Sequence, residues 1–298
     1  MPSAYRLSLM AYGLVVATCG TDAFGAIDST ELAAARALFN QNDKSREAET
    51  AYEKIVAADP TCAEAQNYLA QLALRRDDAG QALAHAEKAA ALAPDNADIQ
   101  NTLGDAYGRS AQKAGIFSQL GLAKKSLAAY QRAVALEPAN VDYHQDLFEY
   151  YRAAPGIAGG GADKALAEAA TIKQLDPRRG HLAFGTLYAA DKKFDQALAE
   201  FDGVLKTAPE DYAALYQVGK LAAQSGQFLD RGLVALHRCL DLAPPAAPDT
   251  PSRAAAQWRI GNIFEKKNDL VAARAAYEAA LRLDPKLTQA AEALKKLK

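Results

Sequence analysis

The sequence has few of the residues from which most enzymes and metal proteins build their sites. Its 298 residues contain three cysteines and four histidines, and these form no HExxH or CxxC motif; GxSxG is absent too. Those motifs supply a zinc site with its base, a redox or metal pair, and an activated serine, respectively. We therefore expect no enzyme activity, no metal site and no cofactor.

An excess of charge of one sign is also lacking. Lysine and arginine together number 34 and aspartate and glutamate 36, so the formal net charge is −2. Proteins that bind nucleic acid or anionic membranes through charge usually carry a basic excess. We expect no nucleic-acid partner.

Only the N-terminus has an apolar run of note. It starts MPSAYR and continues with the uncharged LSLMAYGLVVATCG, and Ala23-Phe24-Gly25 follows as a cleavage site of small residues. The run is shorter than the roughly 20 residues that span a membrane. We therefore predict a secretory signal peptide over residues 1–25, a periplasmic protein, and no integral membrane span in the mature chain. The alternative is a lipid anchor through Cys19.

What the sequence does have is a repeat marked by proline. Seven prolines close short helical endings rich in alanine and leucine, such as AYEKIVAADP and AYEAALRLDP, at intervals of 32 to 44 residues. They are Pro60, Pro94, Pro138, Pro177, Pro209, Pro244 and Pro285. Proline lacks an N–H and disfavours helical geometry in the residue before it, so each one stops a helix. A period of this size predicts a solenoid of helix pairs.

Within the repeat, small and large residues recur at fixed places. Residues 178–209 and 254–285 illustrate the pattern. Counted from the start of each unit, the matching pairs are Phe184 and Ile260, Gly185 and Gly261, Tyr188 and Phe264, Ala197 and Ala273, Phe201 and Tyr277, Val204 and Ala280. Small residues let two helices approach closely, and large ones fill the seam between them. The pattern resembles the tetratricopeptide repeat family.

The resemblance implies an all-α fold, an α-α superhelix of about seven helix hairpins with a C-terminal capping helix, over residues 26–298. The predicted units are 28–60, 63–94, 97–138, 141–177, 178–209, 212–244 and 254–285, and the capping helix is 286–298. Cys62 and Cys239 belong to distant units, so we expect no disulfide between them. Cys239 occupies a small-residue packing position, where a buried thiol is expected.

Two neighbouring units depart from the pattern. The third carries an insertion, SAQKAGIFSQL, at residues 110–120, and the fourth a glycine-rich segment at 154–161. The glycines do not form a phosphate loop, because Lys164 has neither Gly before it nor Ser or Thr after it. We expect a widened turn in which glycine adopts positive φ. Ile116, Phe117 and Leu120 need cover, and the glycine-rich segment is the nearest candidate to provide it.

The resemblance also implies that ligands lie on a concave face lined by the first helix of each unit. One half of this face is polar and the other aromatic. The candidate binding residues are Asn67, Arg75, Asn101, Asp105, Arg109, Gln145 and Glu149 in the polar half, and Tyr216, Lys220, Trp258 and Asn262 in the other. The alternative is that the aromatic residues pack internally and the charged ones form a solvated face. The lysine/asparagine carboxylate clamp of chaperone-binding members is not reproduced.

These expectations favour a protein-interaction scaffold. Asparagine and glutamine both donate and accept hydrogen bonds, which suits the backbone of an extended polypeptide. We predict a scaffold that binds such a segment in the cell envelope, with other envelope proteins as partners. The alternative is a carrier of a glycan or lipid in the bore of the superhelix.

Overall fold

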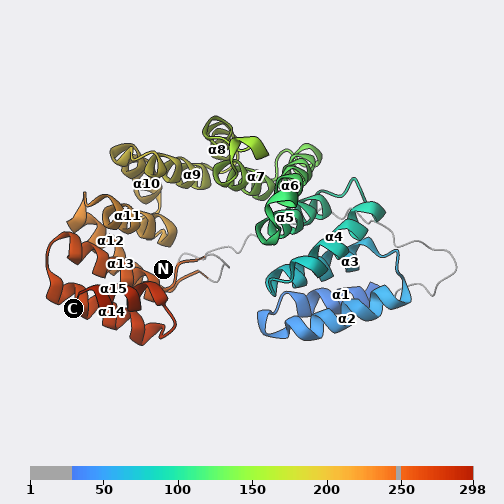
Figure 1. The fold of residues 1–298 in the computed structure, drawn as a ribbon, viewed down its shortest axis with the longest axis horizontal. Helices are drawn as coiled ribbons and strands as arrows, with labels where there is room; N and C mark the ends of the chain where they lie inside the picture. The colour runs from blue at the N-terminus through green and yellow to red at the C-terminus, as the bar shows by residue number, and fades with distance from the viewer. Residues whose placement is uncertain (1–28, 246–249, 298) are drawn as a thin grey trace, which may run out of the picture. The chain divides into compact units, whose positions relative to one another are not determined.

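The computed structural model describes residues 29–245 and 250–297, and every regular element within them is helical. This confirms the all-α repeat fold (Figure 1). The helices are α1 (Ser29–Phe39), α2 (Ser45–Ala58), α3 (Ala63–Arg75), α4 (Ala79–Leu92), α5 (Ala97–Lys113), α6 (Ile116–Leu136), α7 (Val141–Ala153), α8 (Ala162–Leu175), α9 (Pro177–Ala190), α10 (Phe194–Thr207), α11 (Tyr212–Ser225), α12 (Leu229–Asp241), α13 (Arg253–Lys266), α14 (Leu270–Leu283) and α15 (Thr288–Lys296). Two short 3-10 turns, Asn42–Lys44 and Gly156–Ala158, complete the set.

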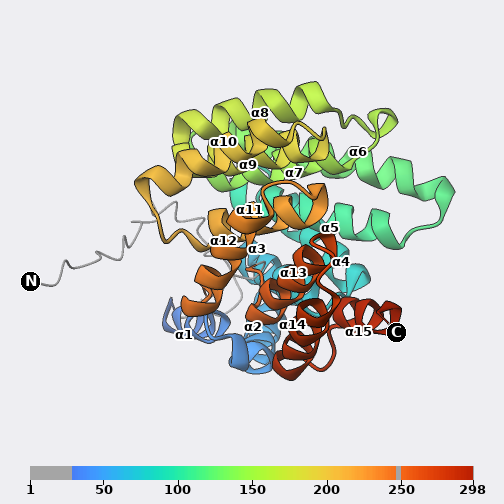
Figure 2. The same ribbon diagram turned by 90° about the vertical axis from the view of Figure 1, so that its left-hand side faces the viewer.

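Helices that follow one another in the chain pack against each other, as α3 does on α4, α5 on α6 and α13 on α14, and α15 packs on α14 as the cap (Figure 2). Short polar side chains begin many of them. Asp78, Asn96 and Asp211 each accept a hydrogen bond from the backbone N–H three residues later. Such capping satisfies an N–H that the helix itself leaves unpaired. Pro177 has two roles: α8 ends before it, and it is the first residue of α9. At that position a helix makes no hydrogen bond through the backbone N–H, so proline, which has none, is tolerated.

Glycine sets how closely the two helices of a pair approach. Gly104, Gly185, Gly219 and Gly261 each lie on a first helix against a large side chain of the second, and a Cβ atom there would come within 2.2 to 2.6 Å of it. The facing residues are Tyr130, Phe201, Leu236 and Tyr277. Real Cβ atoms do not approach so closely, so any larger residue would push the helices apart. The predicted small-residue positions therefore face the seam.

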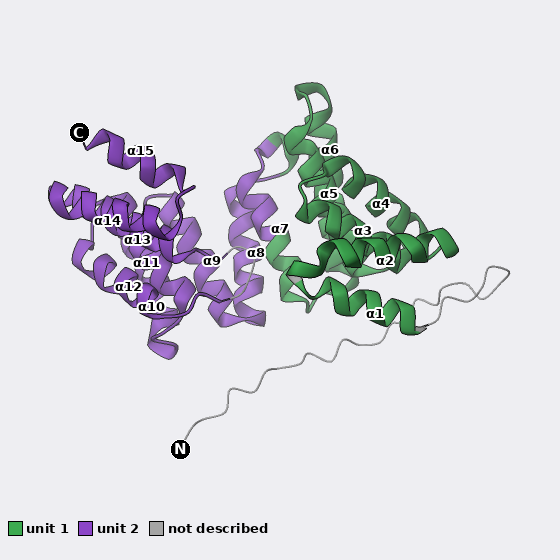
Figure 3. Cartoon of the chain, turned by 90° about the horizontal axis from the view of Figure 1, so that it is seen from below, with its two compact units in different colours: residues 1–146, 157–159 green, residues 147–156, 160–298 purple. Residues whose placement is uncertain are grey.

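The chain divides into two compact units, coloured separately in Figure 3. Unit 1 runs to Asp146 and also takes in Ile157–Gly159. Unit 2 comprises Leu147–Gly156 and the chain from Gly160 onward. The helix α7 is thus shared between them. The extent of the repeat domain as one array over 26–298 stays a prediction.

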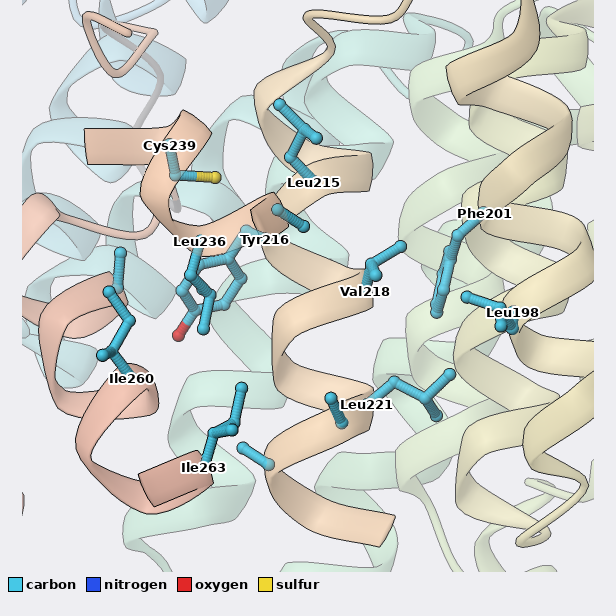
Figure 4. Close-up of a cluster of buried hydrophobic side chains, with 14 of the residues drawn as sticks. Leu198, Phe201, Leu215, Tyr216, Val218, Leu221, Leu236, Cys239, Ile260 and Ile263 are labelled. Carbon is cyan, nitrogen blue, oxygen red and sulfur yellow. The ribbon is translucent and has the colours of Figure 1, made fainter. Parts of the chain in front are cut away.

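The main core of unit 2 lies where α10, α11, α12 and α13 meet (Figure 4). Phe201, Leu236 and Ile263 are almost fully buried there. Cys239 is a free, buried thiol in the same core, as its packing position predicts. In unit 1, Cys62 is also buried and forms no disulfide with a described residue. At the C-terminal end α15 packs on α14 with Ala290 fully buried.

The insertion and the glycine-rich segment differ in part from expectation. The insertion lengthens the third hairpin: α5 runs to Lys113, and α6 begins at Ile116. Gly159 lies against Leu127, about three turns along α6. Ile116 and Phe117 remain 79% and 101% exposed, so the expected cover over them is wrong. The predicted positive φ occurs at Gly159, at 95°, and at Gly161, at 151°.

The predicted signal peptide, 1–25, and the alternative anchor Cys19 lie outside the described residues. Among the helices that are described, none combines the length and apolar character of a membrane span.

Candidate functional site

In unit 1, two predicted binding residues of α5 form hydrogen bonds with side chains of the neighbouring helices. The Asn101 side chain on α5 donates from Nδ2 to Oδ2 of Asp146 at 2.8 Å. The Tyr130 hydroxyl donates to Oδ1 of Asp105 at 2.7 Å. We name these four residues, Asn101, Asp105, Tyr130 and Asp146, the acidic cluster.

The surroundings of Asp105 in the acidic cluster disfavour its charged carboxylate form. Burial and the neighbouring Asp146 raise the pKa of Asp105 from its ordinary 3.8 to about 7, although Tyr130 and Arg109 oppose the shift. Close like charges and loss of water both favour the neutral carboxyl. Near neutral pH this position therefore holds a mixture of charged and neutral Asp105.

The other predicted residues of unit 1 are also engaged or buried. Asn67 on α3 is 6% exposed, and its Oδ1 has no hydrogen-bond partner within the described part of the chain. The Arg75 guanidinium lies 3.8 Å above the Phe39 ring and donates to its carbonyl. Arg109 lies 3.4 Å from Asp77. These three predicted residues of unit 1 thus already have internal contacts or little exposure. Gln145, on the part of α7 that belongs to unit 1, is partly buried.

Unit 2 contains a different arrangement, an open pocket of about 430 Å³. We call it the cationic pocket. Its polar lining comes from the end of α7, from α9 and the turn after it, and from α11, and consists of Arg152, Thr186, Lys192, Gln217, Lys220 and Gln224. Phe194, Phe201 and Leu221 provide an apolar part of the wall. A volume of this size falls within the usual range for ligand sites.

Several polar side chains in the cationic pocket have no partner inside the protein. Among the residues that the structure describes, no hydrogen bond or ion pair ties down the side chains of Lys192, Gln217, Lys220 or Gln224. Arg152 is held by Glu149, which accepts a hydrogen bond from its Nε at 2.9 Å. Polar groups that lie in a cleft without internal partners are available to a ligand.

Lys220 is held among like charges. Burial lowers its pKa, the positive charges of Arg259 and Arg152 lower it further, and Glu149 opposes them. Arg259 has its guanidinium 4.1 Å from the ring centre of Trp258, and its Nε is buried without a hydrogen-bond partner in the described chain. Positive charges on α7 and α13 thus both act on Lys220.

The three other predicted residues differ in their environments. Tyr216 is 7% exposed and belongs to the core, so for this residue the packing alternative holds (Figure 4). Trp258 is partly buried beside Arg259. Asn262 donates from Nδ2 to the Tyr277 hydroxyl at 2.8 Å, which ties it to the second helix of its own hairpin.

Sequence reasoning selected Glu149 and Lys220 as groove residues but assigned them to opposite halves, whereas the charge of Glu149 acts on Lys220 in the structure. It missed Lys192, Gln217 and Gln224. Gln224 lies near the end of the first helix α11, on the predicted concave face, so its position in the sequence could have identified it. Lys192 lies in a turn, at a φ of 60°, and no sequence pattern marks it.

A family model for the tetratricopeptide repeat matches residues 32–107, 182–230 and 230–288. The chain belongs to this family. Among curated proteins, it is 33% identical over 123 residues to the cellulose synthase operon protein C of Pseudomonas fluorescens, a match that covers 39% of this chain and 9% of that protein. The chain therefore spans only a small part of the length of this relative.

Solved tetratricopeptide and related structures share the fold at low identity. A tetratricopeptide repeat protein from Parabacteroides merdae superimposes with a TM-score of 0.65 and 15% identity, covering 90% of this chain and 97% of that one. Yeast Tom70 gives 0.66 and 15%, covering 94% and 59%. The human IFIT1 dimer with m7Gppp-AAAA gives 0.62 and 19%, covering 90% and 62%. At these identities the likeness concerns the fold alone.

Proposed function

We propose that this tetratricopeptide repeat chain is a scaffold of the cell envelope that binds an extended polypeptide segment along the first helices of its hairpins. One observation carries the proposal. The cationic pocket gathers side chains from three first-helix regions, and Gln217, Lys220 and Gln224 in it form no hydrogen bond with the described part of the chain. Gln217 and Lys220 are partly buried, where polar groups are normally paired, and Gln224 is exposed beside them, so all three are available to an external partner.

The spacing of the two glutamines suits an extended chain. Gln217 and Gln224 both line the pocket and lie seven residues, or two turns, apart on α11. Two turns of helix rise about 10.5 Å, and three residues of extended chain span about 10 Å. Each amide can donate to a carbonyl and accept from an N–H, so both can bond one ligand backbone.

Two observations support a place in the envelope. The N-terminal segment has the composition of a secretory signal, and a relative bears the name cellulose synthase operon protein C. The test is expression of the full chain in a bacterial host followed by fractionation and mass measurement. A mature protein that begins near Gly25 or Ala26 in the periplasmic fraction is expected. An uncleaved cytoplasmic chain would contradict the localisation, and a lipid-modified chain would identify Cys19 as an anchor.

Peptide binding can be followed through the single tryptophan. Trp258 lies next to Arg259, whose charge acts on Lys220 in the pocket, so an occupant should change its fluorescence. A library of short random peptides is selected on the full chain, and the enriched peptides are titrated against it. The double variant Gln217→Ala/Gln224→Ala should bind them about tenfold more weakly or worse, since two hydrogen bonds are lost.

The control is Gln196→Ala, because Gln196 is exposed on α10 and does not line the pocket. It should bind like the unsubstituted chain. Failure to enrich any peptide would contradict the proposal. Native mass spectrometry of the purified chain tests the alternative, because a retained glycan or lipid would identify a carrier.

A further inference from the structure

We propose that the cationic pocket recognises carboxylate groups on an acidic polypeptide segment, an inference that rests on the proposed function and specifies its ligand. The positive residues Arg152, Lys192 and Lys220 line one pocket, and no aspartate or glutamate does. The lysine/asparagine clamp of chaperone-binding members is not reproduced in this chain. The site is thus a property of this chain's own α7, α9 and α11.

The charge in the pocket is compensated only in part by the described residues of unit 2. Glu149 lies nearby, but Arg152 already holds it with two hydrogen bonds, at 2.9 and 2.5 Å. Lys192 and Lys220 make no ion pair with any residue that the structure describes. Lys220 is partly buried, and holding its charge beside other positive charges costs free energy. An anion placed among them would replace that repulsion with attraction.

Lys192 and its neighbour Lys193 have different surroundings. Lys193, the residue after Lys192, pairs with Asp191 at 3.2 Å and lies outside the pocket. The turn between α9 and α10 therefore carries two lysines, of which one is neutralised and the other contributes to the pocket lining. Lys192 brings its charge to the same cavity as Lys220 on α11.

The shape and polarity favour a carboxylate on a peptide. Gln217 and Gln224 offer amide donors that can bond carboxylate oxygens, and charged acceptors strengthen such bonds. Phe194, which is only partly buried in the pocket wall, can contact the methylene groups of a glutamate side chain. Nucleic acid would need phosphate contacts spread over a wide basic surface, whereas the chain as a whole carries a net charge of −2.

The experiment compares three labelled peptides of one design, in which apolar residues alternate with glutamate, with glutamine or with lysine. Anisotropy with the full chain should give at least about tenfold tighter binding for the glutamate peptide than for the glutamine peptide, since charged hydrogen bonds are the stronger ones. Lys220→Gln should weaken binding of the glutamate peptide about tenfold and remove most of its advantage over the glutamine peptide. Lys220→Glu should shift the preference toward the lysine peptide.

Lys206→Gln is the matched control, because Lys206 is exposed on α10 of the same unit and outside the pocket. It should leave all three affinities unchanged. Thermal unfolding of each variant shows that the fold is retained, and Lys220→Gln should melt no lower than the unsubstituted chain.

Equal affinity for the glutamate and glutamine peptides would overturn the inference, and so would an equal loss in Lys206→Gln. If an oligoadenylate or an oligogalacturonate competes at the pocket more strongly than the glutamate peptide, and depends on Lys220, the pocket belongs to that ligand class instead. If neutral peptides bind through Gln217 and Gln224 while acidity adds nothing, only this inference fails. If no peptide binds, the proposed function fails with it.

Discussion

The two units share one repeat but differ in the contacts that the polar side chains of their first helices make. In unit 1 these side chains bond to one another: Asn101 to Asp146, Tyr130 to Asp105, and Tyr143 to Asp98. In unit 2, Gln217, Lys220 and Gln224 line an open pocket without such bonds. A repeat position therefore does not by itself define a binding residue, because a neighbouring helix can supply the partner that a ligand would otherwise supply.

The chemistry of the neighbours explains the difference. In unit 1 an acid lies opposite an amide or a phenol, so donors meet acceptors. In unit 2 the groups around Lys220 are mostly donors, namely Arg152, Lys192 and Arg259, and donors cannot satisfy one another. This contrast predicts different responses to substitution in the two units.

The largest effect is expected at a glycine of unit 2. In Gly219→Val the new Cβ would lie 2.2 Å from Cγ of Leu236, which α11 and α12 cannot accommodate without separating. We expect a loss of about 3 kcal/mol or more in the free energy of unfolding. Fluorescence of Trp258 reports unit 2 alone, and circular dichroism reports both units. Their transitions in denaturant should separate, with the fluorescence transition moving to lower concentration.

Ala213→Val, at a partly exposed position on the same helix, serves as the control. It should lower the free energy of unfolding by less than about 1 kcal/mol. If the two probes still coincide in Gly219→Val, the units do not unfold separately.

The second prediction concerns pH in unit 1. Because the pKa of Asp105 is about 7 in the folded chain and 3.8 ordinarily, the folded state binds the proton more strongly. The free energy of unfolding should therefore fall as pH rises from about 4 to 7. Asp105→Asn keeps an acceptor for Tyr130 and removes the charge, so at pH 8 it should stabilise the chain by about 1–3 kcal/mol.

Denaturant titrations at pH 5 and pH 8 measure this difference. Asp195→Asn, an exposed acid on α10, is the comparison and should not reproduce the pH dependence. The same gain for Asp105→Asn at both pH values would mean that Asp105 is not strained by its charge.

A smaller stabilisation is expected at Gly121 on α6. No heavy atom lies within 4 Å of a Cβ built there, in contrast with the glycines that face the helix seams. Gly121→Ala should raise the free energy of unfolding by about 0.5–1 kcal/mol, because alanine loses less backbone entropy in a helix. Thermal and denaturant unfolding would measure it, and a loss would show that α6 needs the glycine.

The smallest effect is expected for Lys220→Gln in the absence of ligand. Removing a half-buried charge next to Arg259 and Arg152 should stabilise unit 2 by a few tenths of a kcal/mol, as for exposed or partly exposed charges generally. The pKa of Lys220 is lowered, so the gain should shrink as pH rises through that pKa, where the lysine loses its charge. Destabilisation at neutral pH would mean that Lys220 has a structural role.

The sequence predicted the hairpins well because their determinants are local. A proline stops a helix wherever it stands, and Gly185 or Gly261 permits a close approach to a residue less than twenty positions away. It predicted the burial of single residues less well. Tyr216 and Trp258 occupy equivalent positions, yet Tyr216 lies in the core and Trp258 is partly exposed. Phe117 was expected to be covered and is fully exposed, because the loop meets α6 at Leu127 instead.

The amino-acid sequence alone determined that this chain is helical, repeated and built of closely packed pairs, since caps, prolines and small residues act over one or two turns. Only the tertiary structure decided which polar side chains pair with each other and which line a pocket. That outcome depends on distances between helices that lie many residues apart, as between Asn101 and Asp146 or between Arg152 and Lys220. Each of those side chains could satisfy its bonds in more than one way until its neighbours were in place.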